Sequence, residues 1–134
     1  MLHEEENNLL TRTGPETPAG RFMRRYWLPV LLEAELLDDQ PVRAKILGEE
    51  LVAFRTEDGT IGLLDERCPH RGASLGLARC EPDGIRCLFH GWKFGPEGAV
   101  LDLPTEPPTR QGLKDKIPVR SFPTRVAGGI VWAY

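Results

Sequence analysis

Cysteine and histidine are both scarce in this sequence, with three residues of each among 134. An odd number of cysteines argues against a framework of disulfide bonds. Two cysteines and two histidines nevertheless fall close together, between residues 68 and 90. The third cysteine, Cys80, has no histidine at ligand spacing, and we predict that it is a bystander thiol. The third histidine, His3, lies at the N-terminal end and is not expected to be a ligand.

The sequence also lacks a long hydrophobic run, a signal peptide and an excess of positive charge. No apolar run approaches the roughly 20 residues of a membrane span. The acidic N-terminus has neither the basic nor the apolar region of a signal peptide. A net charge of −3 gives no reason to expect nucleic acid or an anionic membrane as a partner. We therefore expect a cytoplasmic protein with no nucleic-acid or membrane partner.

Turn signals divide the chain into two parts. Residues 1–41 form a helical and extended N-terminal segment, with weak helical patterning over Glu4–Arg12 and Gly20–Tyr26. Residues 42–134 contain short apolar stretches separated by glycine and proline, which is typical of an all-β sandwich or barrel-like domain. The predicted strands are Val42–Leu47, Leu51–Arg55, Thr60–Leu64, Ile85–Cys87, Trp92–Phe94, Ala99–Leu101, Val119–Phe122 and Gly129–Tyr134; Trp27–Leu32 is a first strand or a packing segment.

The four clustered residues form one pair with the pattern Cys-x-His, Cys68 and His70, and one with Cys-x-x-His, Cys87 and His90. Two thiolates and two imidazoles suit either zinc or an iron–sulfur cluster. Structural zinc sites more often use Cys-x₂₋₄-Cys and His-x₃₋₅-His spacings. A single residue between Cys68 and His70 points their side chains in different directions, which favours two metal centres over one tetrahedral ion.

Glycine follows each histidine closely, as Gly72 in the first loop and Gly91 in the second. Without a side chain, the backbone can fold closely over a cluster and direct N–H groups at its sulfur atoms. Each loop therefore combines a cysteine, a histidine and a glycine that follows the histidine closely.

The sequence around these loops resembles the Rieske iron–sulfur domain. The motifs Cys68-Pro69-His70-Arg71-Gly72-Ala73-Ser74-Leu75 and Cys87-Leu88-Phe89-His90-Gly91-Trp92-Lys93-Phe94 carry the resemblance. The flanks Arg24–Leu31 and Gly128–Tyr134 are similar to the N-terminal domain of the oxygenase component of ring-hydroxylating Rieske oxygenases, in the phthalate dioxygenase branch. The resemblance covers nearly the whole chain.

This resemblance implies a Rieske iron–sulfur fold, an antiparallel β-sandwich with a small cluster-binding subdomain. The cluster-binding loops would span residues 68–75 and 87–94. The resemblance also implies a Rieske-type [2Fe–2S] cluster, with Cys68 and Cys87 on the inner iron and His70 and His90 on the outer, solvent-facing iron. The residues expected around these ligands are Arg71, Gly72, Gly91 and Trp92, the last as a packing lid beside the second loop.

The implied function is one-electron transfer. A flavin- and iron–sulfur-containing, NAD(P)H-linked reductase would supply the electron, and the mononuclear iron of an aromatic-ring-hydroxylating oxygenase would receive it. In this family that iron usually belongs to a neighbouring subunit of a homotrimer. Its catalytic domain is absent from this chain, so we expect no complete catalysis by the chain alone. The alternatives are a free-standing, ferredoxin-like Rieske carrier and a zinc-bound interaction domain.

The loops differ from those of high-potential Rieske proteins at four positions. Ala73 and Phe89 occupy the places of two disulfide-forming cysteines, and Trp92 and Phe94 occupy those of a serine and a tyrosine whose hydroxyls bond to sulfur. Hydrogen bonds to sulfur stabilise the more negative, reduced cluster. Their loss predicts a midpoint potential in the lower part of the Rieske range of roughly −150 to +300 mV.

Overall fold

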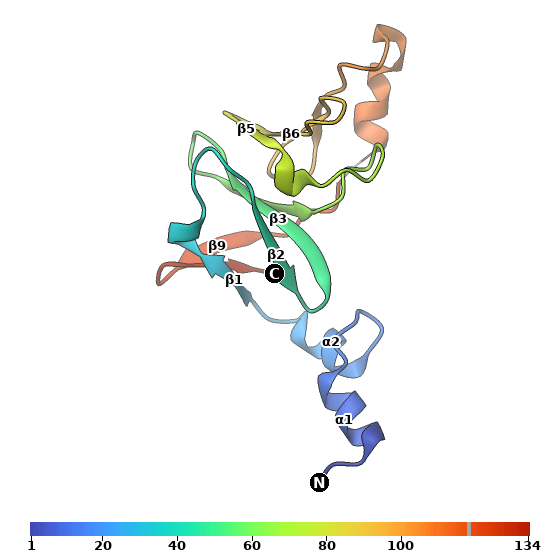
Figure 1. Cartoon of the computed structure of the whole chain (residues 1–134), viewed down its shortest axis with the longest axis vertical. Helices are drawn as coiled ribbons and strands as arrows, with labels where there is room; N and C mark the ends of the chain where they lie inside the picture. Colours follow the sequence, from blue (N-terminus) through green and yellow to red (C-terminus); the bar gives the residue numbers. More distant parts are fainter. Residues whose placement is uncertain (118) are drawn as a thin grey trace.

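The computed structural model describes residues 1–117 and 119–134 and consists mainly of short antiparallel strands (Figure 1). The strands are β1 (Leu28–Leu32), β2 (Val42–Ile46), β3 (Glu49–Arg55), β4 (Ile61–Asp65), β5 (Arg79–Glu81), β6 (Gly84–Arg86), β7 (Lys93–Phe94), β8 (Val100–Asp102), β9 (Thr124–Ala127) and β10 (Ile130–Ala133). The helices are α1 (Glu4–Thr11) and α2 (Pro18–Met23), with 3₁₀ turns η1 (Glu33–Glu35), η2 (Leu75–Leu77) and η3 (Pro108–Lys116). The strands form three sheets, in the orders β1-β10-β9, β2-β3-β4 and β5-β6-β7-β8. The predicted all-β class with a short helical N-terminal segment is confirmed.

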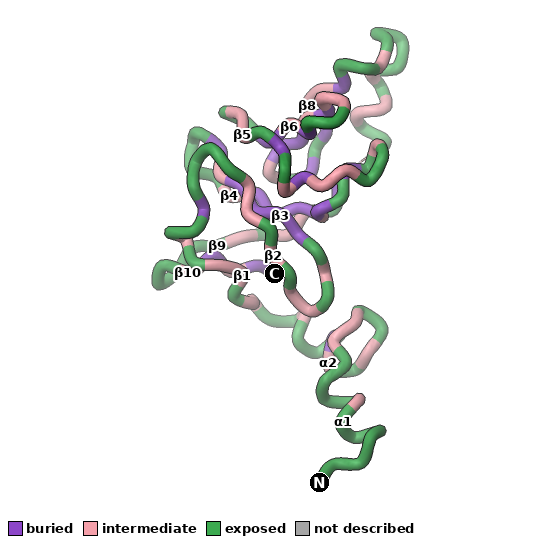
Figure 2. Tube along the Cα trace, in the orientation of Figure 1, coloured by how far each residue is buried: buried purple, intermediate pink, exposed green. Residues whose placement is uncertain are grey.

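The sheet β2-β3-β4 lies between two hydrophobic cores. Along β3, Val52 and Phe54 belong to one core, whereas Leu51 and Ala53 belong to the other. Side chains alternate between the two faces of a strand, so a continuous buried run means that both faces are covered. Figure 2 shows this buried run along β3. The core that contains Val52 and Phe54 extends to the sheet β5-β6-β7-β8, which carries the predicted second ligand loop between β6 and β7.

The turn between β3 and β4 has the predicted hairpin chemistry. Gly59 has a φ of 85°, in the left-handed region that glycine adopts without strain. The carboxylate of Asp58 accepts hydrogen bonds from the Thr60 amide at 3.0 Å and from the Thr56 hydroxyl at 2.6 Å. The hairpin pairs Arg55 with Ile61, as the Asp58-Gly59 signal predicts.

The first strand and the last strand of the chain are neighbours. β1 pairs antiparallel with β10, and Leu32 lies opposite Ile130. Residues 28–32 therefore share a sheet with the end of the described chain, which identifies Trp27–Leu32 as containing a strand. The division of the chain at residue 41 remains a prediction.

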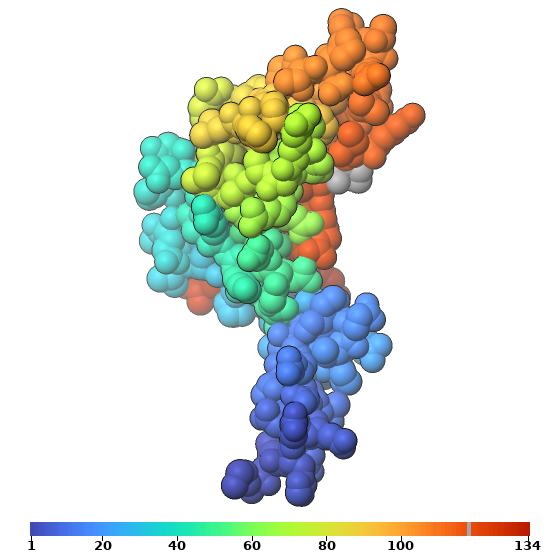
Figure 3. All heavy atoms as spheres, turned by 45° about the vertical axis from the view of Figure 1, so that its right-hand side comes forward, coloured from blue at the N-terminus to red at the C-terminus, as the bar shows by residue number. Residues whose placement is uncertain are grey.

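The helices α1 and α2 project from the opposite end of the body from β5 and β6 (Figures 1 and 3). Arg24, at the end of α2, connects them to the sheets. Its guanidinium donates to the Thr13 carbonyl at 2.7 Å and to the Glu49 carboxylate at 2.9 Å. No helix within the described residues is long and apolar enough to cross a membrane.

Three elements differ from the sequence prediction. Residues 119–122 form an isolated bridge between Ser121 and Leu64 instead of the predicted strand, and β9 begins only after Pro123. β5 was not predicted because Arg79-Cys80-Glu81 is too polar and short to show strand periodicity. The 3₁₀ segment η3 follows Pro107 and Pro108, where proline favours the first turn of a helix.

Candidate metal centre

The two predicted ligand loops are closed by the same pair of backbone hydrogen bonds. In the first loop, the Cys68 amide donates to the Ala73 carbonyl at 2.8 Å, and the Gly72 amide donates to the Cys68 carbonyl at 2.8 Å. In the second loop, the Cys87 amide donates to the Trp92 carbonyl at 2.9 Å, and the Gly91 amide donates to the Cys87 carbonyl at 3.0 Å. The loops therefore share one backbone design, although the spacing from cysteine to histidine differs.

Both glycines that follow the histidines lie in the left-handed region. Gly72 has a φ of 70° and Gly91 a φ of 76°. A Cβ atom on Gly91 would lie 2.9 Å from Cγ of Pro104, whereas a Cβ on Gly72 would meet no atom within 4 Å. Backbone conformation thus requires glycine at both positions, and close packing adds a second requirement at Gly91.

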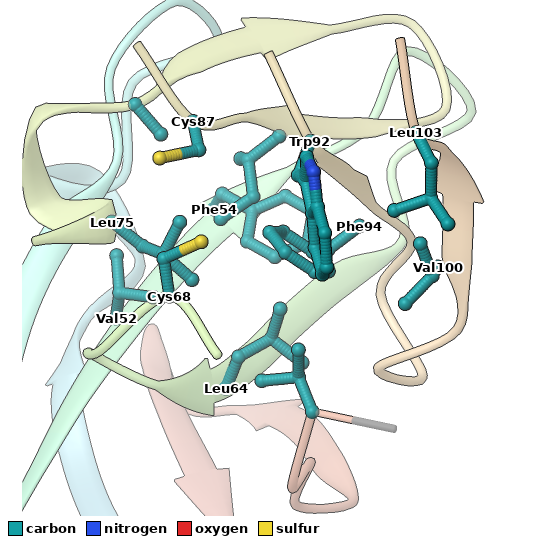
Figure 4. Close-up of a cluster of buried hydrophobic side chains, with 13 residues drawn as sticks. Val52, Phe54, Leu64, Cys68, Leu75, Cys87, Trp92, Phe94, Val100 and Leu103 are labelled. Atoms are coloured by element: carbon teal, nitrogen blue, oxygen red, sulfur yellow. The ribbon is translucent and has the colours of Figure 1, made fainter. Parts of the chain in front are cut away.

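The sulfur atoms of the two loops lie together inside the core. Cys68 and Cys87 are each 3% exposed, and Figure 4 shows them at one edge of the cluster of buried side chains. Burial, together with the neighbouring Cys87, raises the pKa of the Cys68 thiol to about 11, against the lowering effect of hydrogen bonds from the His70 and Arg71 amides. A buried thiol pair of this kind becomes a thiolate pair at neutral pH when a metal supplies compensating positive charge.

The two predicted imidazole ligands lie next to each other and are half-buried. The ring centroids of His70 and His90 are 4.6 Å apart, with the rings edge to face. Burial lowers the pKa of His70, and the charges of His90 and Arg71 lower it further, whereas Glu106 opposes them. The neutral imidazole is the form that binds a metal.

One ring nitrogen of His70 has no partner in the protein. Its Nδ1 atom is buried and makes no hydrogen bond within the described part of the chain. Buried polar atoms are almost always paired in folded proteins. A metal ion bound at Nδ1 would satisfy this atom, so the donor set fits a metal centre.

The four candidate ligands form two pairs. Among the described residues, no group of three or more histidine, cysteine, aspartate or glutamate side chains could hold a single ion. A structural zinc site needs four such side chains around one ion. A Rieske cluster needs only two protein ligands per iron. Two cysteines and two histidines in adjacent pairs meet that need.

Trp92 crosses from the second loop to the first. Its indole stacks on the imidazole of His70, with centroids 4.5 Å apart and planes 5° apart. Its Nε1 donates to Oγ1 of Thr105 at 3.1 Å, and the residue is only 4% exposed. We predicted a packing lid beside the second loop; the structure brings Trp92 into contact with the histidine of the first loop as well.

Arg71 is exposed, and within the described residues it makes no ion pair. Cys80 is half-buried against the core, and burial raises its pKa. His3 precedes helix α1, where its amide donates to Glu6 at 2.9 Å. Neither Cys80 nor His3 joins the four clustered residues.

Sequence reasoning missed two charged residues beside the loops, Glu66 and Arg86. The Glu66 side chain is 6% exposed, accepts a hydrogen bond from the Ser74 hydroxyl and pairs with Arg67 at 3.0 Å. Arg86 donates to the Gly91 carbonyl at 2.6 Å. One sequence feature could have pointed to this region: an arginine directly precedes the cysteine of each loop, Arg67 in the first and Arg86 in the second.

Comparison with known proteins identifies the family. The profile of the Rieske [2Fe-2S] domain matches residues 26–123. The chain is 45% identical over 135 residues to the oxygenase subunit of 3-chlorobenzoate-3,4-dioxygenase from Comamonas testosteroni, and 46% identical over 136 residues to that of phthalate 4,5-dioxygenase from Pseudomonas putida. These alignments cover 100% of this chain but only 31% of each relative.

A solved structure supports the same relationship. The complex of the oxygenase and ferredoxin of carbazole 1,9a-dioxygenase matches with a TM-score of 0.70 and 31% identity. The match covers 81% of this chain and 28% of that chain. The chain therefore belongs to the Rieske [2Fe-2S] domain family, has a Rieske-type [2Fe–2S] cluster as its cofactor, and corresponds to the Rieske part of phthalate dioxygenase-like oxygenase subunits.

Proposed function

We propose that Cys68 and Cys87 hold the inner iron of the cluster and that His70 and His90 hold the outer iron. The observation that carries this assignment is the unpartnered, buried Nδ1 of His70 beside the His90 ring. The burial of both sulfur atoms supports it, because a buried inner iron is shielded from water. When bound, the cluster supplies reversible one-electron transfer.

The protein's part is to hold these ligands and to leave one edge of the site accessible. Between Cys87 and His90, the side chains of Leu88 and Phe89 are 67% and 60% exposed. Pro69, between the ligands of the first loop, is exposed as well. An apolar rim around half-buried imidazoles suits transient docking of a redox partner. We propose this edge as the electron entry and exit.

We further propose the direction of transfer. An NAD(P)H-linked reductase with flavin and iron–sulfur centres delivers the electron, and the mononuclear iron of an aromatic-ring-hydroxylating oxygenase receives it, in a neighbouring subunit of a homotrimer. Support comes from the relatives, which are oxygenase subunits, and from the carbazole dioxygenase structure, which is a complex with a ferredoxin. The three free cysteines suit a reducing compartment, and we propose the cytoplasm.

Two side chains of the second loop support a low midpoint potential. Trp92 uses its only donor on Thr105, and Phe94 is fully buried and has no donor on its side chain. Neither side chain therefore stabilises the reduced cluster by a hydrogen bond to sulfur.

Electron paramagnetic resonance of the dithionite-reduced chain, combined with a potentiometric titration, tests this function. We expect a Rieske-type signal and a midpoint in the lower part of the range of roughly −150 to +300 mV. Cys68→Ser and His70→Ala should each abolish the signal, and Cys80→Ser should retain it. A zinc-containing protein without the signal would disprove the assignment, and a midpoint near the upper end would disprove the low potential.

A further inference from the structure

An arginine stands directly before each ligand cysteine, and both arginines make the same contact. Nη1 of Arg67 donates to the carbonyl of Gly72 at 3.5 Å, and Nη1 of Arg86 donates to the carbonyl of Gly91 at 2.6 Å. In each loop, the accepting glycine also donates its amide to the cysteine carbonyl. Each arginine therefore reaches across its own loop to the glycine that lies beyond the histidine.

The two contacts differ greatly in strength. The Arg86 side chain is 22% exposed, whereas that of Arg67 is 63% exposed. Arg86 also donates through Nε and Nη2 to the two oxygens of Glu81, at 2.7 and 3.2 Å, and through Nη1 to Asp102 at 2.8 Å. A forked guanidinium held by two carboxylates is confined to one geometry. Arg86 can therefore fix the carbonyl that it bonds, and Arg67 cannot do so to the same degree.

The first loop has another support. The buried carboxylate of Glu66 accepts the hydroxyl hydrogen bond of Ser74, and the Leu75 amide donates to the Glu66 carbonyl at 2.7 Å. These contacts hold the far end of the first loop to the residue before Arg67. The second loop is also tied to β5 by the pair between Lys93 and Glu81 at 2.9 Å. Among the described residues, however, Arg86 alone bonds its side chain to a carbonyl of this loop.

We propose that Arg86 is the positioning residue of the second ligand loop. By holding the Gly91 carbonyl against Glu81 of β5 and Asp102 of β8, it sets the backbone directly after His90 and so orients the imidazole. The inference rests on the proposed role of Cys87 and His90 as ligands. Residues that orient metal ligands typically change metal affinity or activity 10- to 100-fold when replaced.

The test compares the cluster-loaded chain with its Arg86→Gln, Arg86→Lys and Arg67→Gln variants. Cluster loss in the presence of an iron chelator is followed by visible absorbance, and the reduced cluster by electron paramagnetic resonance. We expect Arg86→Gln to lose the cluster about tenfold faster than the wild type and to shift or broaden the signal. Arg67→Gln, the matched control, removes the weaker carbonyl contact and the pair with Glu66 and should change both measurements much less.

The Arg86→Lys variant tests whether the forked shape of the guanidinium matters or only its positive charge. A lysine keeps the positive charge but cannot bond both carboxylates and the carbonyl together. We expect faster cluster loss and a broadened signal in this variant too, with a far-ultraviolet circular dichroism spectrum like that of the wild type. If Arg86→Gln does not fold, Arg86→Lys decides the question. Wild-type behaviour of a folded Arg86 variant, or equal effects at Arg67, would overturn the inference. Absence of a Rieske signal from the wild type would instead refute the ligand assignment.

Discussion

At the scale of single residues, Trp92 joins the two ligand loops. Its backbone closes the second loop through the Cys87 amide, and its indole lies flat on His70 of the first. The bond from Nε1 to Thr105 holds the indole in this plane. One side chain therefore both fills the core and limits the rotation of an imidazole in the other loop.

Replacing Trp92 should separate these two roles. Trp92→Ala leaves a cavity and should lower the free energy of unfolding by about 3–5 kcal/mol. Trp92→Phe keeps an aromatic ring against His70 but loses the bond to Thr105, so its cost should be smaller. Chemical denaturation of the cluster-loaded variants measures both costs. Equal losses would mean that ring stacking contributes nothing beyond the hydrogen bond.

The clustering of the four candidate ligands could be predicted from the sequence because the information for it is local. Spacing within each loop, and the glycines that the turns require, both appear in a few consecutive residues. The contact of Trp92 with His70 and the bonds of Arg86 to Glu81 and Asp102 could not be predicted this way. They depend on how separate strands pair, and no periodicity in the sequence records that pairing.

At the scale of elements, the two loops have the same hydrogen bonds but different surroundings. Only Gly91 lies against another segment, at Pro104. Alanine in the left-handed region costs roughly 1–2 kcal/mol at either position. At Gly91, overpacking against the rigid proline ring should add about 1–3 kcal/mol.

Gly72→Ala and Gly91→Ala therefore form a matched pair. We expect the second variant to unfold at the lower denaturant concentration and to contain less iron after purification. Iron analysis and denaturant titration of the two variants provide the measurement. A greater loss at Gly72 would contradict the packing argument.

The strands beneath the second loop are joined by charges centred on Glu81. Its carboxylate accepts hydrogen bonds from Arg79 and Arg86 at 2.7 Å and pairs with Lys93 at 2.9 Å. Arg86, then Lys93 and Arg79, hold the pKa of Glu81 well below its ordinary value of 4.5. Because the folded state binds the proton less readily than the unfolded state, this carboxylate stabilises the fold above about pH 4.5.

The lowered pKa of Glu81 sets the direction in which stability changes with pH. Stability from Glu81 is lost as the pH falls below about 4.5 towards its lower folded pKa. Glu81→Gln should therefore be less stable than the wild type at neutral pH, and the difference should shrink as the solution is acidified. Urea unfolding at a series of pH values provides the measurement. A difference that stays constant down to pH 3 would exclude this role for the carboxylate.

At the scale of the whole molecule, the part of the chain that carries the two candidate ligand loops and the N-terminal helices lie at opposite ends of the body (Figure 1). Helix α1 has no buried residues, whereas β1 pairs with β10 beside the fully buried Val131. The two halves of the N-terminal segment therefore contribute very differently to stability.

Two deletions test this difference. Removing residues 1–12 keeps Thr13 and Arg24 and should change the free energy of unfolding by no more than about 0.5 kcal/mol, as surface changes usually do. Removing residues 1–32 eliminates β1 and uncovers one face of the core. We expect that chain to lose its cooperative unfolding transition. Thermal unfolding of both proteins measures the effect, and equal stability would contradict the pairing of β1 with β10.

The fold class was predictable because turns and short apolar stretches alternate throughout residues 42–134. The pairing partners of strands far apart in the sequence were not predictable. The Asp58-Gly59 hairpin joins neighbours in sequence, so its local turn signal was sufficient. The β5 and β9 strands carry few buried side chains, and hydrogen bonding to neighbouring strands defines them instead.

The pairing of β1 with β10 also sets an order of events on the ribosome. About 100 residues separate these strands, and synthesis at roughly 5–20 residues per second means a delay of roughly 5–20 s between them. Strands β5 to β8 and both ligand loops are complete before β10 emerges, and their contacts are local in sequence. The ligand loops can therefore assemble while the nascent chain still lacks the strand that closes its sandwich.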